Sequence, residues 1–194
     1  MSLWPFRSPE LLHRAHSRLV LIDVQDKLVA AIPQREQLVA RCRLLAEGAR
    51  VFGVPIAGTE QYPRGLGSTV SELSEFVPLP RDKLRFSAAE ALGWPPAAEA
   101  DDGRRQLVLA GIEAHVCVLQ SAMDWLAMGY AVYVAGDAVG SRCPADRDAA
   151  LHRLRDAGAV VASVESILFE WCDTAAAAEF KTLSRLLKEQ MRSA

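Results

Sequence analysis

The stretch RQLVLAGIEAHVCVLQSAMDWLAMGYAVYVAGDAV, residues 105–139, decides the fold. Its near-continuous apolar runs at 105–112 and 130–139 are typical of strands that are buried on both faces of a parallel sheet. Between these runs, residues 116–129 predict a helix. A strand, a helix and a second strand in this order indicate a right-handed crossover between parallel strands.

The same alternation continues along the rest of the chain. We expect further strands at 18–25, 54–59, 83–88 and 159–164, helices at 35–53, 145–158 and 174–193, and a loop at 60–69. This pattern predicts an α/β fold: a three-layer α/β/α sandwich around a mostly parallel sheet of about six strands, Rossmann-like, in a single domain over residues 1–194.

The composition is that of an ordinary soluble protein, with 51% hydrophobic and 24% charged residues and a formal net charge of -2. This charge gives no reason to expect nucleic acid or a membrane surface as a partner. The N-terminus has no apolar segment typical of a signal peptide, and no stretch is long enough to span a bilayer. The 4 cysteines form no CxxC pair, so we expect a reduced, cytoplasmic protein.

Polar residues follow several of the predicted strands. Asp23, Thr59, Glu60, Cys117 and Asp137 lie at or just after strand ends. Ligands of parallel sheets bind beyond the carboxyl ends of the strands, so we expect these side chains to meet at one edge.

The thiol of Cys117 is the candidate nucleophile. A helix N-terminus and a neighbouring ammonium both lower the pKa of a thiol, and a neighbouring carboxylate accepts its proton. A helix starting near His115, together with Lys83 and Asp23, would supply these conditions and lower the pKa of Cys117. Each residue also has a simpler explanation, because buried cysteines usually pack and aspartates often end strands.

Three segments together resemble the isochorismatase-like cysteine hydrolases: LVLIDVQDKLV (19–29), KLRFSA (83–88) and the stretch from Leu107 to Arg142. The resemblance implies that Asp23, Lys83 and Cys117 form the catalytic set. It also implies a cis peptide bond between Ile112 and Glu113, with the backbone N–H groups of Glu113 and Cys117 as the oxyanion hole.

Further residues are candidates for the substrate pocket, and the roles of several remain open. Glu60 could contact substrate or begin a capped loop, Trp125 fits the helix core better than a pocket, and His115 is expected to line the pocket or pack rather than form a dyad with Cys117. The tentative pocket residues are Gln25, Glu60, Gln61, Tyr62, Phe86 and His115.

Residues 59–76 contain no histidine, where metal-dependent members of the resembled family carry an Asp-x-His motif. We therefore expect no catalytic metal and no cofactor. The resulting hypothesis is a metal-independent cysteine hydrolase that cleaves a small amide or related C–N substrate through a thioester. The alternative is a catalytically silent scaffold or partner-binding domain. In either case the family resemblance implies a homo-oligomer.

Overall fold

The computed structural model of the protein describes residues 7–193 and contains a six-stranded, all-parallel sheet. The strands lie in the order β3-β2-β1-β4-β5-β6. Their bounds are β1 Ser17–Ile22, β2 Ile56–Gln61, β3 Arg81–Lys83, β4 Gln106–Ile112, β5 Ala131–Gly140 and β6 Val160–Ala162. Residues 1–6 and residue 194 lie outside the described residues. The expectation of no signal peptide concerns the first of these segments.

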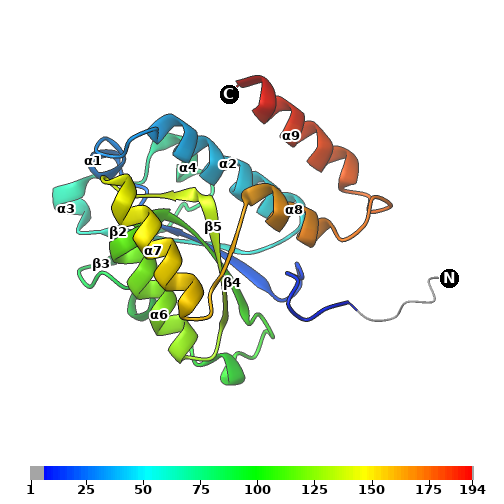
Figure 1. Ribbon diagram of the computed structural model, residues 1–194, viewed down its shortest axis with the longest axis horizontal. Helices are drawn as coiled ribbons and strands as arrows, with labels where there is room; N and C mark the ends of the chain where they lie inside the picture. Colours follow the sequence, from blue (N-terminus) through cyan, green and yellow to red (C-terminus); the bar gives the residue numbers. More distant parts are fainter. Residues whose placement is uncertain (1–6, 194) are drawn as a thin grey trace.

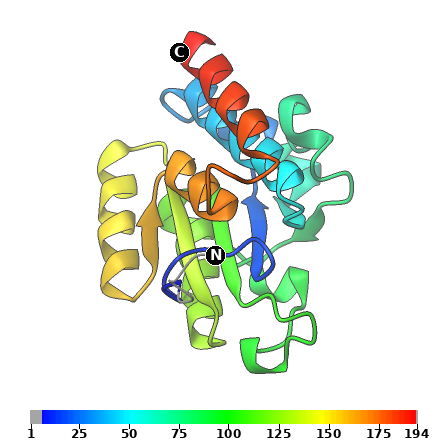
Figure 2. The ribbon, with the colours of Figure 1, turned by 90° about the vertical axis from the view of Figure 1, so that its right-hand side faces the viewer.

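Helices cover both faces of this sheet (Figures 1 and 2). The longer helices are α2 Arg35–Val51, α6 Leu119–Ala127, α7 Pro144–Asp156, α8 Val164–Cys172 and α9 Phe180–Ser193. The short ones are α1 Asp26–Val29, α3 Pro63–Leu66, α4 Ser71–Ser74, α5 Ala89–Leu92, the 3-10 turn η1 Ala97–Glu99 and the π-helical turn η2 Ala114–Val118.

The alternation of β1 shows how the core is divided. Leu19 and Leu21 pack in one hydrophobic cluster with α2, α8 and the buried part of α9, whereas Val20 and Ile22 pack in a second cluster with α6 and α7. Successive side chains of a strand point to opposite faces, so a continuous apolar run supplies both clusters. The predicted three-layer α/β class is confirmed.

Three predicted segments have different bounds in the structure. The predicted strand at 83–88 ends at Lys83, and residues 84–88 form a loop instead. The predicted strand at 159–164 is present as β6 but ends at Ala162, because Ser163 caps α8 by accepting a hydrogen bond from the Ser166 amide. The predicted loop at 60–69 contains the last two residues of β2 and the short helix α3.

Gly111 permits the close approach of β4 to β1, next to the segment that carries Cys117. Its φ is +125°, and a Cβ atom at this position would lie 2.1 Å from the carbonyl oxygen of Ile22. The register between β4 and β5 also shifts between Leu109 and Gly111. Since β1 and β4 are neighbours at the point where the strand order reverses, this contact shapes the crevice in which ligands of such sheets bind.

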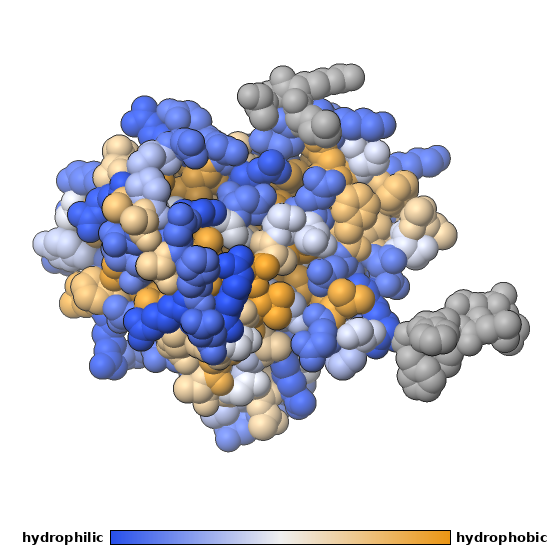
Figure 3. Space-filling view, in the orientation of Figure 1, coloured by the Kyte–Doolittle hydropathy of each residue, from blue (hydrophilic) through white to orange (hydrophobic). Residues whose placement is uncertain are grey.

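Figure 3 shows hydrophilic and hydrophobic residues interspersed on the face seen in Figure 1. Among residues 7–193, no helix combines the length and the apolar character that crossing a bilayer requires.

We predict that Gly111→Ala destabilises the protein by about 3–5 kcal/mol, because the new methyl group meets backbone atoms that cannot rotate away. Gly158→Ala is the matched control, since Gly158 also has a positive φ, of +98°, but nothing lies within 4 Å of its Cβ position. The control should lose only about 1–2 kcal/mol. Denaturant unfolding measures both, and equal losses would contradict the role of the close contact.

Candidate active site

Asp23 is held at the carboxyl end of β1 by contacts on two sides. The chain turns sharply after the strand, with φ of +52° at Asp23 and a hydrogen bond from the Gln25 amide to its carbonyl at 2.8 Å. The carboxylate is fully buried, and its Oδ1 accepts a hydrogen bond of 2.8 Å from the Thr59 hydroxyl. Its Oδ2 lies 2.6 Å from the ammonium nitrogen of Lys83. The result is an ion pair shielded from solvent.

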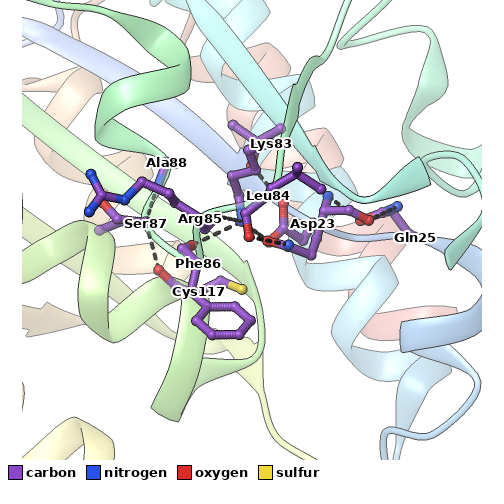
Figure 4. Close-up of polar contacts among 12 residues, drawn as sticks. Asp23, Gln25, Lys83, Leu84, Arg85, Phe86, Ser87, Ala88 and Cys117 are labelled. Carbon is purple, nitrogen blue, oxygen red and sulfur yellow. Dashed lines mark hydrogen bonds and ion pairs between the residues drawn. The ribbon is translucent and has the colours of Figure 1, made fainter. Parts of the chain in front are cut away.

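Lys83, the last residue of β3, has its ammonium group surrounded by protein acceptors (Figure 4). Besides the Asp23 contact, Nζ donates to Gln61 Oε1 at 2.7 Å and to the carbonyl of Phe86 at 2.9 Å, with the carbonyl of Arg85 at 3.3 Å. An ammonium has three donors, so the protein itself engages all of them. Lys83 is therefore fixed in place as a charge beside Asp23.

Cys117 lies in the π-helical turn η2 and is only 5% exposed. The pKa of its thiol is raised to about 12, chiefly by burial and next by the charge of the Asp23 carboxylate, whereas the Lys83 ammonium acts in the opposite direction. The charges of both Asp23 and Lys83 act on this pKa, so both groups lie near the sulfur. The expectation of a lowered pKa is wrong for this state, because burial and the carboxylate outweigh the ammonium.

The turn that leads into Cys117 begins with a cis peptide bond between Ile112 and Glu113. The carbonyl of Glu113 accepts hydrogen bonds of 3.1 Å from the amides of Val116 and Val118, the two neighbours of Cys117. The Glu113 carboxylate accepts from both the amide and Nε of Arg142, at 3.0 and 2.9 Å. The turn is thus tied to the loop that follows β5.

Three of the tentative pocket residues use their polar groups within the protein. Glu60 accepts hydrogen bonds from the amide and hydroxyl of Thr69, which favours its structural role over substrate contact. Gln25 is fully buried and bonds the backbone of Gln61 in both directions, at 3.0 and 2.7 Å. The side chain of Gln61 links Lys83 to the carbonyl of Leu84.

The other three tentative pocket residues are more accessible. Tyr62 and Phe86 are each 51% exposed on the loops that follow β2 and β3. His115 is half-buried and its Nδ1 lies 2.9 Å from the Ser141 hydroxyl, while its Nε2 lies 3.9 Å from the Asp146 carboxylate. These contacts fit the packing role expected for His115.

Two residues considered for this edge of the sheet belong elsewhere. Asp137 lies inside β5, which continues to Gly140, and its carboxylate accepts a hydrogen bond from the Val164 amide at the start of α8. It therefore does not join the other strand-end residues. Trp125 is fully buried and stacks on Trp94 with ring centroids 5.8 Å apart, as the core interpretation predicts.

Within the part of the chain that the structure describes, no three His, Cys, Asp or Glu side chains gather as a metal site would require. The expectation of no catalytic metal stays a prediction. The contact of Thr59 with Asp23 agrees with the expected meeting of strand-end side chains, whereas three other contacts were not predicted: those of Ser121 with Cys117, Ser141 with His115 and Arg142 with Glu113. A signal existed for Ser121, since it lies four residues after Cys117 on the same helical face.

A buried thiol beside a carboxylate and an ammonium, at the switch point of a parallel sheet, defines a Rossmann-like protein with a cysteine-centred site. The family model of the isochorismatase domain matches residues 17–166. Isochorismatase domain-containing protein 2A of Mus musculus is 39% identical over 176 residues, which cover 89% of this chain and 83% of the relative. The chain therefore belongs to the isochorismatase family.

Other relatives widen this comparison. The secreted isochorismatase effector Isc1 of Phytophthora sojae is 37% identical and matches 91% of this chain and 87% of its own length. The MAR1 ribonuclease structure from Caenorhabditis elegans is 33% identical, with a TM-score of 0.82 and 92% of both chains covered. The ycaC gene product of Escherichia coli, described as an octameric hydrolase of unknown specificity, shares the fold at 21% identity and a TM-score of 0.77, with 97% of this chain and 100% of that chain covered.

These comparisons leave two expectations as predictions. Because one relative is secreted, the cytoplasmic location is not established by family membership. Because one similar structure is described as a ribonuclease, the absence of a nucleic-acid partner also stays a prediction.

We predict that iodoacetamide labels Cys117 slowly at neutral pH, because its raised pKa leaves the thiol protonated. The labelling rate should rise about tenfold for each pH unit between pH 7 and 9, as the thiolate fraction grows. Mass spectrometry of the labelled peptides measures this for each cysteine. The exposed Cys143 is the internal comparison and should react first. Labelling of Cys117 ahead of Cys143 at pH 7 would contradict the raised pKa.

Proposed function

We propose that the protein is a metal-independent cysteine hydrolase that cleaves a small amide or related C–N substrate through a thioester. The observation that carries this proposal is the buried Lys83–Asp23 ion pair of 2.6 Å, both partners of which face the thiol of Cys117. A base fixed beside a nucleophile is the arrangement that covalent acyl transfer needs.

In the first half of the reaction, Asp23 accepts the thiol proton as the sulfur attacks the carbonyl carbon of the substrate. The C–S bond forms and the carbonyl electron pair moves onto oxygen, giving a tetrahedral oxyanion. When this intermediate collapses, the C–N bond breaks and the proton on Asp23 passes to the leaving nitrogen. Ammonia or an amine departs, and a thioester on Cys117 remains.

In the second half, Asp23 accepts a proton from water as the water oxygen attacks the thioester carbon. Collapse of the new tetrahedral intermediate breaks the C–S bond, and the proton on Asp23 returns to the sulfur. The product is a carboxylic acid, and the enzyme is restored. The raised pKa of the resting thiol disfavours loss of its proton to solvent, so the proton passes directly to Asp23.

The backbone amides of Glu113 and Cys117 are the proposed donors to the oxyanion. The hydrogen bonds of the Glu113 carbonyl go to Val116 and Val118 and pass over the Cys117 amide, which supports its availability to substrate. Removing one donor of an oxyanion hole slows catalysis by about 10²–10³-fold in other enzymes. Tyr62, Phe86 and His115 are proposed to border the substrate.

The test is a screen of small amides, nicotinamide and carbamoyl compounds for ammonia release. For any substrate found, we predict that Cys117→Ala abolishes turnover and that Asp23→Asn lowers kcat by about 10²–10⁴-fold, because the proton acceptor is lost. Cys143→Ala is the matched control, since it removes an exposed thiol, and should leave kcat unchanged. Ammonia release that survives Cys117→Ala would overturn the mechanism.

The same assay separates the alternatives. Activity should persist in the presence of chelators, and loss of activity would contradict the proposal of a metal-independent, cofactor-free site. A catalytically silent scaffold would release no ammonia from any compound.

Incubation with RNA tests the activity named for the C. elegans relative. Light scattering tests the proposed homo-oligomer, which the octameric E. coli protein of the same fold supports.

A further inference from the structure

We infer that Ser121 is a positioning residue that joins the loop beneath Lys83 to the helix turn that carries Cys117. This inference rests on the proposed function. The side chain of Ser121 is fully buried, one helical turn after Cys117. Its hydroxyl donates to the carbonyl of Cys117 at 2.6 Å and accepts from the amide of Ala88 at 2.8 Å.

The first of these bonds alone would mean little. Serine hydroxyls within helices often donate to the carbonyl four residues earlier. The second bond is different, because Ala88 lies 33 residues away in the sequence, on the loop after β3. A single buried hydroxyl thus connects the loop after Lys83 to the turn that carries Cys117, and the proposed reaction needs these two segments aligned.

The loop of residues 84–88, which we call the strap, is held at both ends. At one end the ammonium of Lys83 donates to the carbonyls of Arg85 and Phe86. At the other end the Ala88 amide donates to Ser121. Figure 4 labels every residue of the strap beside Asp23 and Cys117. One end is therefore fixed by Lys83 itself, and the other is fixed by Ser121, which bonds Cys117.

Loss of the Ser121 hydroxyl would affect both segments together. The buried Ala88 amide would lose its acceptor and the Cys117 carbonyl would lose a donor. The strap would then keep its bonds to Lys83 and Gln61 at one end and lose the hydrogen bond at the other. We expect a loosened strap to expose Cys117, a residue that is only 5% exposed at rest, and to disturb its alignment with Asp23 and Lys83.

The test compares Ser121→Ala with Ser17→Ala. Ser17 is also fully buried, and it is hydrogen-bonded to His13, Gln106 and Trp171. It lies at the amino end of β1, whereas the candidate site lies beyond the carboxyl end. Both variants should lower Tm. We expect only Ser121→Ala to speed iodoacetamide labelling of Cys117, about tenfold, while lowering kcat for the amide substrate about 10- to 100-fold.

A general loss of stability would speed labelling of Cys117 in both variants, because a buried thiol is labelled when the protein opens, so the comparison with Ser17→Ala isolates the local role of Ser121. Labelling needs no substrate, so it still tests Ser121 if the hydrolase proposal fails. Hydrogen exchange of the strap is the second measurement, and its amides should exchange faster in Ser121→Ala while those of β4 do not change. Equal labelling rates in the two serine variants, or unchanged exchange in the strap, would overturn the inference.

Discussion

The buried contact between the ammonium of Lys83 and the carboxylate of Asp23 is the interaction on which the rest of the site depends. Two charges removed from water are tolerated only when good geometry and further hydrogen bonds compensate their desolvation, and removing one partner of such a pair costs about 3–5 kcal/mol. This requirement explains the surrounding polar groups: Thr59 bonds Asp23, and Gln61 bonds Lys83. Gln25 in turn fixes the backbone of Gln61. The polar residues at the carboxyl end of β2, together with Gln25 after β1, thus support the ion pair.

The sequence was sufficient to predict this arrangement at the level of elements. Apolar runs identified the strands, and the rule for carboxyl ends of parallel strands pointed Asp23 and Cys117 to one edge. Lys83 was proposed as the ammonium beside the thiol, but its strand was predicted at 83–88, whereas β3 has 3 residues and ends at Lys83. Asp137 was misplaced for a related reason, since the register shift between β4 and β5 carries β5 beyond it to Gly140.

The electrostatics of the site could not be predicted in the same way. A helix N-terminus and a lysine both argue for an acidic thiol, and both are visible in the sequence. The dominant effect, burial of Cys117, depends on how the strap and the π-helical turn pack together and reverses the direction of the shift. Glu60 illustrates the same limit, because its partner Thr69 follows it by nine residues through a loop whose path no local pattern specifies.

A raised thiol pKa is compatible with the proposed chemistry because the net charge of the buried site need not change during attack. At rest, one negative charge on Asp23 faces the ammonium of Lys83. When the thiol proton moves to Asp23, negative charge shifts toward sulfur and then to the oxyanion, while Lys83 stays in place with all its donors engaged. A thiolate formed by loss of a proton to solvent would instead add a second buried negative charge, which is the state that the raised pKa disfavours. Direct transfer between Cys117 and Asp23 avoids that cost, and it requires the fixed alignment that the ion pair and the strap maintain.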